Sequence, residues 1–148
     1  MNVLVIDPSK VFRTLWNRMV LSVGYEPIAV ETGEAGLAAL RERHIDIVCV
    51  SLTLPDMDGV EFSKQLRLQP QYKSLPVILL TSTDDTSIRE TAFQAGITEI
   101  HSKTRVDQLL QRVIRFVEES KQVISGRVLY IEDSTVAAHV MLGYLRAI

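Results

Sequence analysis

Short apolar runs alternate along this chain with stretches in which apolar residues recur at helical spacing. The runs predict five strands, over residues 2–6, 25–31, 46–50, 75–81 and 97–102. The fourth run is continuously apolar, as in a strand buried on both faces, and the fifth is more polar, as in an edge strand. The stretches between and after them predict five helices, over residues 9–23, 32–44, 58–69, 84–95 and 104–122. Such regular alternation predicts an α/β fold with a parallel sheet covered on both faces.

Residues at the helix ends support this assignment. A possible cap followed three residues later by an acidic residue opens two of the helices: Asp58 with Glu61, and Thr104 with Asp107. Asp84 or Asp85 can cap the helix between them. Within the first helix we expect Trp16 and Met19 to pack in the core. His44 is expected at the end of the second helix, where an imidazole suits the helix dipole.

Composition narrows the class of protein. The chain has 148 residues, 47% of them hydrophobic, and a formal net charge of −2. No apolar stretch approaches the roughly 20 residues of a membrane span, and the balanced charge argues against a nucleic-acid surface. The chain starts without a signal-peptide pattern, so a cytoplasmic location is expected. Its single cysteine, Cys49, lies within a predicted strand and is expected to be a buried core residue.

Several residues fall where the predicted strands end, and together they resemble the response-regulator receiver domain. Asp7 closes the first strand, and Thr81 ends the fourth. Pro55 and the pair Asp58-Gly59 follow the third strand, and Lys103 follows the fifth. This resemblance covers most of residues 1–120 and implies a flavodoxin-like (βα)5 fold with strand order 2-1-3-4-5. It also implies a site beyond the carboxyl ends of the strands, in which Thr81 and Lys103 would bind a phosphoryl group.

The turn after the first strand argues against two other nucleotide- or flavin-binding classes. A flavodoxin has a phosphate loop rich in serine, threonine and glycine at this turn, and a Rossmann dehydrogenase has glycines there. The sequence Asp7-Pro8-Ser9-Lys10 is neither.

The departures from the family pattern fall in the implied pocket. Ser51 stands where the family has the aspartate that accepts the phosphoryl group, and Pro8 replaces the second acidic residue of the first turn. Ile100 occupies the position of the aromatic switch residue, and Thr104 replaces a proline. The resemblance therefore implies a degenerate phosphorylation pocket made of Asp7, Pro8, Ser51, Thr53, Thr81 and Lys103.

Charge predicts how this pocket would behave. A typical receiver pocket holds three carboxylates and a lysine, and Mg²⁺ relieves their repulsion. Here only Asp7 and Lys103 remain, so we expect weak or no metal binding and a direct or water-mediated pair at a partly exposed pocket mouth. Ser51 would need a base to act as a nucleophile, and we expect neither His101 nor Asp7 to be placed for that role. Asp56 is expected to lie beyond the strand end.

These residues predict a non-enzymatic signal-transduction module of a two-component phosphorelay that acts without phosphorylation. Its partners would be proteins: a histidine kinase, an output domain or an adjacent receiver, with no nucleic acid and no membrane. The expected contact face comprises the fourth helix, fifth strand and fifth helix, with apolar contacts from Ile88, Ala92, Ile100 and Val106. The alternative is a receiver that is phosphorylated on a replacement acceptor, or that acts through a second receiver.

The last 22 residues carry the pattern of such a second receiver. Residues 128–134 repeat the pattern of residues 3–9, but with an intact acidic pair, Glu132 and Asp133. We therefore expect a degenerate receiver over residues 1–122, a linker over 123–126, and the first strand and helix of a second receiver over 127–148. One strand and one helix cannot bury an apolar face alone. The chain is thus expected to be a fragment of a longer protein, and we expect it to form a homodimer through this tail.

Overall fold

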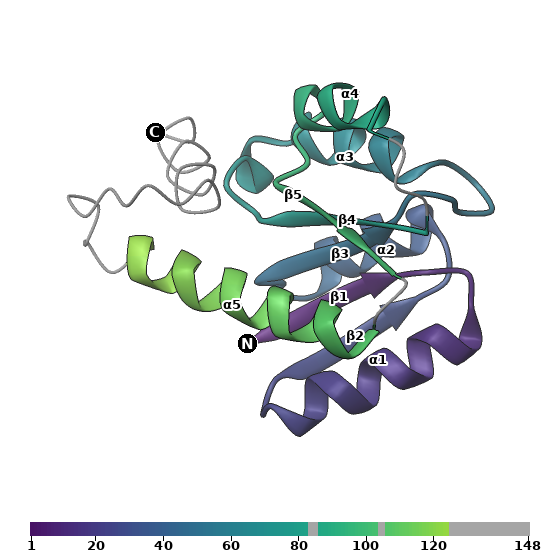
Figure 1. Ribbon diagram of the computed structural model, residues 1–148. Coiled ribbons are helices and arrows are strands. Elements are labelled where there is room, and N and C mark those ends of the chain that lie inside the picture. Colours follow the sequence, from purple (N-terminus) through teal and green to yellow (C-terminus); the bar gives the residue numbers. More distant parts are fainter. Residues whose placement is uncertain (83–85, 104–105, 125–148) are drawn as a thin grey trace.

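The computed structural model describes residues 1–82, 86–103 and 106–124 as a parallel five-stranded sheet between two layers of helices (Figure 1). The strands are β1 (Asn2–Ile6), β2 (Glu26–Val30), β3 (Ile47–Ser51), β4 (Val77–Thr81) and β5 (Glu99–Ser102). The helices are α1 (Lys10–Ser22), α2 (Gly33–Glu42), α3 (Gly59–Arg67), the short 3-10 helix η1 (Pro70–Tyr72), α4 (Ile88–Gln94) and α5 (Val106–Ile124). The strand order is β2-β1-β3-β4-β5, which confirms the predicted flavodoxin-like fold.

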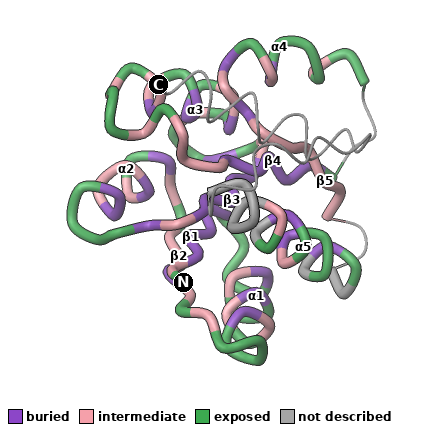
Figure 2. The backbone as a smooth tube through the Cα atoms, turned by 90° about the vertical axis from the view of Figure 1, so that its left-hand side faces the viewer, coloured by how far each residue is buried: buried purple, intermediate pink, exposed green. Residues whose placement is uncertain are grey.

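The sheet is buried on both faces because each face has its own apolar core. On one face α1 and α5 pack against β1, β3 and β4, and Trp16 is fully buried there with Met19 packed beside it, as predicted. On the other face α2, α3 and α4 contribute Leu40, Phe62 and Ala92. Every residue of β3 and β4 is buried, and Figure 2 shows these strands in the interior of the fold. β5 pairs with β4 at the edge of the sheet, as its polar sequence predicts.

Helix ends follow local chemistry where their residues are described. The Asp58 carboxylate accepts a hydrogen bond from the Glu61 N–H at 2.8 Å, so the predicted cap of α3 is confirmed. At α4, however, the N-cap residue is Ser87, whose side chain makes no capping hydrogen bond. The predicted caps Asp84, Asp85 and Thr104 lie outside the described residues.

One prediction about where a helix ends differs from the structure, and the predictions for the C-terminal tail concern residues that it does not describe. α2 ends at Glu42, so His44 follows the helix; its imidazole pairs instead with the Asp46 carboxylate at 3.0 Å. α5 continues to Ile124, and residues 125–148, including Glu132 and Asp133, lie outside the described residues. The linker, the second receiver and the tail-mediated dimer therefore stay predictions. Among the described residues, no helix is long and apolar enough to cross a membrane.

Candidate functional site

Four polar side chains meet at the carboxyl end of the sheet because parallel strands end at the same edge. Asp7 directly follows β1, Ser51 ends β3, Thr81 ends β4, and Lys103 follows β5. Asp7 is completely buried, Ser51 and Thr81 are nearly so, and the Lys103 side chain is 23% exposed. The structure thus brings these four predicted residues together from four strands.

The carboxylate of Asp7 is the centre of this cluster. Its Oδ2 accepts hydrogen bonds from the Ser51 hydroxyl and from the Lys103 ammonium. Its Oδ1 accepts a third from the backbone N–H of Ser9, at 2.7 Å. The Arg13 guanidinium also contacts this residue, by donating to the Asp7 backbone carbonyl oxygen at 2.7 Å. Both carboxylate oxygens are therefore occupied, and one positive and one negative charge balance.

The Asp7–Lys103 pair is direct, and it is more buried than the sequence predicted. We expected a partly exposed pocket mouth, but Asp7 has no exposed surface. The reason is that Asp7 follows β1, an interior strand between β2 and β3, whereas Lys103 follows the edge strand β5 and keeps part of its side chain at the surface. A buried charge needs its partner far more than an exposed one does, so this pair is expected to matter for folding.

Ser51 lies within the same network. Its hydroxyl donates to Asp7, and Lys103 Nζ lies 3.5 Å from its Oγ. The prediction that Asp7 is not placed to act as a base for Ser51 is therefore wrong on geometry. The Nε2 atom of His101, in contrast, lies 3.6 Å from a carboxylate oxygen of Glu99.

The Lys103 ammonium has an aromatic neighbour that sequence reasoning missed. Its Nζ lies 4.5 Å from the centroid of the Phe12 ring, a cation–π distance. That ring in turn stacks on Trp16, with centroids 6.0 Å apart and an interplanar angle of 18°. The helical spacing of Phe12 and Trp16 was visible in the sequence, but only the fold brings Lys103 over the ring.

The cluster does not fit a Mg²⁺ site. Mg²⁺ prefers carboxylate and water oxygens in octahedral geometry. Pro8 supplies no ligand oxygen from its side chain, and both oxygens of Asp7 already accept hydrogen bonds. Across the part of the chain that the structure describes, no three His, Cys, Asp or Glu side chains are grouped to hold a metal ion.

The remaining predicted site residues lie around this cluster. Pro8 and Thr53 are exposed, and Thr53 forms an isolated antiparallel bridge with Asp58. Ile100 is half-buried and packs against the core on the α2–α3–α4 face. Ala92, which we expected on a contact surface, is completely buried in that core, so this part of the prediction is wrong.

Asp56 also has a role that the sequence did not reveal. Its two carboxylate oxygens accept hydrogen bonds from the backbone N–H groups of Gly33 and Glu34, at 3.0 and 2.9 Å. Burial tends to raise the pKa of Asp56, but these hydrogen bonds outweigh it and lower the pKa. The sequence shows an acidic residue in the loop after β3. It does not show that this residue caps α2.

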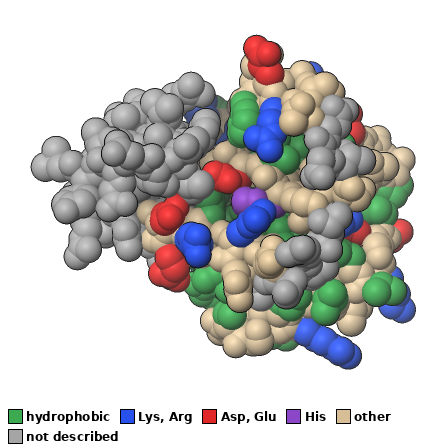
Figure 3. Space-filling model, viewed as in Figure 1, with side chains coloured by type: hydrophobic (Ala, Val, Ile, Leu, Met, Phe, Trp, Pro, Cys, Tyr) green, Lys and Arg blue, Asp and Glu red, His purple; other side chains and the backbone are tan. Residues whose placement is uncertain are grey.

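The edge of the sheet carries charged groups of both signs. Figure 3 shows a histidine among acidic and basic side chains on this face. Here burial, together with the positive charge of Arg112, lowers the pKa of His101 to about 4. Burial and the nearby Glu119 raise the pKa of Glu99. This edge therefore keeps His101 neutral near pH 7.

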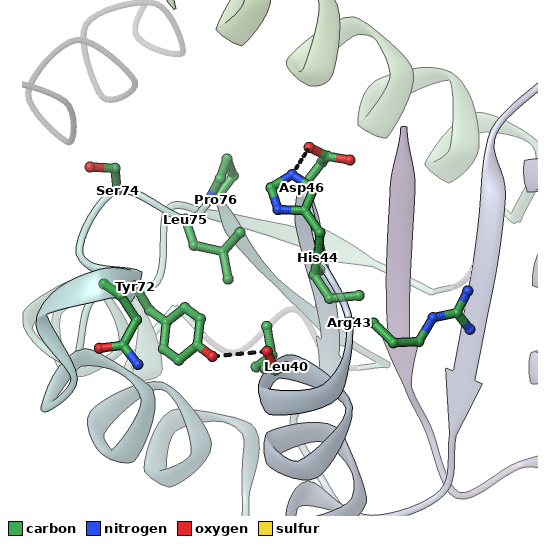
Figure 4. A pocket seen from close by; sticks show the side chains of 10 residues that line it. Leu40, Arg43, His44, Asp46, Tyr72, Ser74, Leu75 and Pro76 are labelled. Atoms are coloured by element: carbon green, nitrogen blue, oxygen red, sulfur yellow. Dashed lines mark hydrogen bonds and ion pairs between the residues drawn. The ribbon is translucent and has the colours of Figure 1, made fainter.

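A separate hollow of about 300 Å³ lies at the opposite, amino-terminal end of the sheet (Figure 4). Its walls come from the loop after α2 and from the segment between η1 and β4. The Tyr72 hydroxyl donates to the Leu40 carbonyl oxygen at 2.9 Å and joins the two walls. Arg67 donates to the carbonyl oxygen of Lys73 at 3.3 Å and so contacts the segment between η1 and β4. None of the polar residues at the carboxyl end of the sheet lines it.

Comparisons with known proteins agree with this architecture. The family model of the response regulator receiver domain matches residues 3–115. The chain is 31% identical over 102 residues to the KDP operon transcriptional regulatory protein KdpE of Escherichia coli (strain K12), covering 69% of this chain and 44% of that protein. It is 24% identical over 143 residues to the cyclic di-GMP phosphodiesterase response regulator RpfG of Xanthomonas campestris pv. campestris (strain 8004), covering 93% of this chain and 38% of that protein.

A solved structure extends the comparison to three dimensions. The chemotaxis response regulator CheY4 of Vibrio cholerae superimposes with a TM-score of 0.74 at 27% sequence identity. The match covers 78% of this chain and 97% of CheY4. The chain spans less than half the length of both KdpE and RpfG.

Proposed function

The chain belongs to the response regulator receiver domain family, and on this premise we propose that its receiver transmits signals without being phosphorylated. Receiver domains are signalling modules of two-component systems rather than enzymes. The observation that supports the proposal is the hydrogen-bonded cluster at the carboxyl end of the sheet. There the Asp7 carboxylate is already paired with Lys103 and bonded to Ser51, the residue in the acceptor position.

The chemistry of phosphoryl transfer supports the same proposal. A carboxylate is a competent nucleophile at neutral pH, whereas a serine hydroxyl must first lose its proton to a base. Asp7 accepts that hydroxyl hydrogen bond, but the same carboxylate oxygen also accepts a hydrogen bond from the Lys103 ammonium. Lys103 is also the lysine that would bind the incoming phosphoryl group. A pocket without a magnesium site and with its lysine already paired favours a permanently fixed state.

A receiver that keeps one conformation acts by binding other proteins in that conformation. We propose that its partners are a histidine kinase, an output domain or an adjacent receiver. These are the kinds of protein that receiver domains generally bind. The contact face we propose comprises α4, β5 and α5. Within it the partly buried polar residues of β5 and the exposed polar residues of α5 make the contact, because Ala92 is buried in the core.

Incubation of the protein with acetyl phosphate or phosphoramidate and Mg²⁺, followed by intact-mass measurement, tests the proposal. The native chain is expected to gain no phosphoryl group. The matched control is the double variant Pro8→Asp, Ser51→Asp, which restores both missing carboxylates and is expected to gain one. A stoichiometric phosphoryl adduct on the native chain would overturn the proposal.

One observation favours a second candidate, a receiver that is phosphorylated on Ser51. The Ser51 hydroxyl donates to a carboxylate, which is the arrangement of an activated nucleophile. In that case the native chain would gain a phosphoryl group in the same experiment, and Ser51→Ala would not. Ser51 is only 3% exposed and would have to open to a donor, so we prefer the phosphorylation-independent function.

For residues 127–148 we propose the start of a second receiver with its acidic pair at Glu132 and Asp133. We also propose that this segment mediates self-association, through pairing of its apolar run 128–131. Sedimentation of the full chain at tens of micromolar is expected to show a dimer. Replacement of Leu129 and Ile131 by Glu should return it to a monomer; a native monomer would refute the idea.

A further inference from the structure

The Phe12 ring lies directly beneath the charged end of Lys103. The ammonium nitrogen is 4.5 Å from the ring centroid, and Phe12 is only 9% exposed. A cation over an aromatic face is attracted by the negative charge density of that face, more strongly when both groups are shielded from water. Lys103 therefore has an attractive neighbour in addition to the Asp7 carboxylate.

The ring cannot easily move away from this place. Phe12 lies in the first turn of α1, and its backbone N–H donates to the N-cap hydroxyl of Ser9 at 3.2 Å. Its ring stacks on Trp16, which is completely buried against the sheet and α5. Helix geometry and core packing thus fix the ring through contacts that do not involve Lys103.

We propose that Phe12 is a positioning residue that holds the Lys103 ammonium in its pair with Asp7. A lysine ammonium has three N–H donors. The Asp7 carboxylate, the Ser51 hydroxyl and the Phe12 ring face together surround it. The inference rests on the proposed function, because it names what keeps Lys103 from an incoming anion such as a phosphoryl group.

A simpler role for Phe12 is to fill space in the core, and a change of shape alone would not distinguish the two roles. Fluorine substitution does, because a 3,4,5-trifluorophenylalanine ring keeps nearly the same shape while its face loses negative charge density. If the ring only fills space, fluorination leaves Lys103 unchanged. If the ring attracts the ammonium, fluorination releases it.

The test is competitive acetylation of the full chain with a trace of acetic anhydride, read lysine by lysine by peptide mass spectrometry. The exposed Lys64 and Lys73 serve as internal references. In the native chain we expect Lys103 to react more slowly than both. Trifluorophenylalanine at position 12 and Phe12→Leu should each raise the relative Lys103 rate, roughly fivefold for a contact of this type.

Leu15→Ala is the matched control, since Leu15 is a partly exposed residue of the same helix outside the Asp7–Lys103 cluster. It should leave the relative Lys103 rate unchanged. The fluorinated chain keeps the test valid if Phe12→Leu fails to fold. An unchanged Lys103 rate in the folded fluorinated chain would overturn the inference. The outcome is separate from that of the phosphorylation test, because it measures acetylation of Lys103 and not a phosphoryl adduct.

Discussion

The carboxylate of Asp56 accepts a hydrogen bond from the backbone N–H of Gly33, 3.0 Å away, and so joins the loop after β3 to the start of α2. Gly33 also packs closely against this loop: a Cβ there would lie 2.6 Å from the sulfur of Met57, so the Met57 side chain would have to shift. The loop that follows Ser51 is thereby held against a helix from the preceding βα unit. This fixes one side of the pocket.

Asp56→Ala should therefore loosen the loop and remove a helix cap. We expect the free energy of unfolding to fall by about 1 kcal/mol, as for other capping residues. Urea denaturation measures that change, and the amide resonances of Gly33 and Glu34 should shift the most. Glu31→Gln, at an exposed residue just before the same helix, is the control and should change neither.

Removal of the lysine tests the buried ion pair. Lys103→Met leaves the Asp7 carboxylate buried without its counter-charge, which should lower the free energy of unfolding by about 3 kcal/mol. The double variant Asp7→Asn, Lys103→Met removes both charges and should recover much of the loss. Lys73→Met, at an exposed lysine, is expected to be neutral. Equal urea midpoints for Lys103→Met and the native chain would contradict this account.

Metal binding tests the charge balance of the pocket. Titration of the native chain with Mg²⁺ should give no saturable change in Trp16 fluorescence below a few millimolar, because both oxygens of Asp7 are occupied. Pro8→Asp with Ser51→Asp adds two carboxylates and should create a saturable response. Tight binding by the native chain would show that the Asp7–Lys103 pair opens readily.

Stability should depend on pH through His101, whose pKa is lowered to about 4 by burial and by Arg112. The unfolded chain protonates this histidine below about pH 6.5, whereas the native chain does so only near pH 4. The free energy of unfolding is thus expected to fall as the pH drops through this window. After allowance for partial solvent exposure, the loss should be on the order of 2 kcal/mol.

Urea denaturation of His101→Gln between pH 7 and pH 4.5 measures this contribution. The variant should lose less stability on acidification than the native chain. Glu99 acts in the opposite direction, because its pKa is raised by burial and by Glu119, and it remains in both proteins. His44→Gln, at an exposed histidine, should behave like the native chain. Parallel pH curves for the native chain and His101→Gln would rule out the effect.

A receiver held in one state should lack exchange between conformations. Thr81 is buried at the end of β4, and Ile100 packs against the core on the α2–α3–α4 face. Relaxation dispersion is therefore expected to show no microsecond-to-millisecond exchange centred on these two residues. The double variant Pro8→Asp, Ser51→Asp treated with acetyl phosphate and Mg²⁺ serves as the comparison. Exchange in the untreated native chain at Thr81 and Ile100 would argue against a fixed state.

The sequence by itself determined the elements and the edge at which the site lies. Alternating apolar runs and helical stripes report local structure, so the strands, the helices and the cap at Asp58 could be predicted. Because parallel strands end at one edge, the residues that follow them had to converge, and Asp7, Ser51, Thr81 and Lys103 do. The strand order came from family resemblance, since periodicity carries no information about which strands are neighbours.

Only the tertiary structure decided how the converging side chains are partnered. Lys103 reaches Asp7 across 96 residues of sequence, and Asp56 caps a helix 23 residues before it. The complete burial of Asp7 and the place of Phe12 beneath Lys103 depend on how α1 and the strand-end loops pack over the sheet. A periodic pattern shows which face of an element is buried. It does not show which groups from distant elements meet there, because side-chain hydrogen bonds, ion pairs and cation–π contacts are set by the packed three-dimensional arrangement.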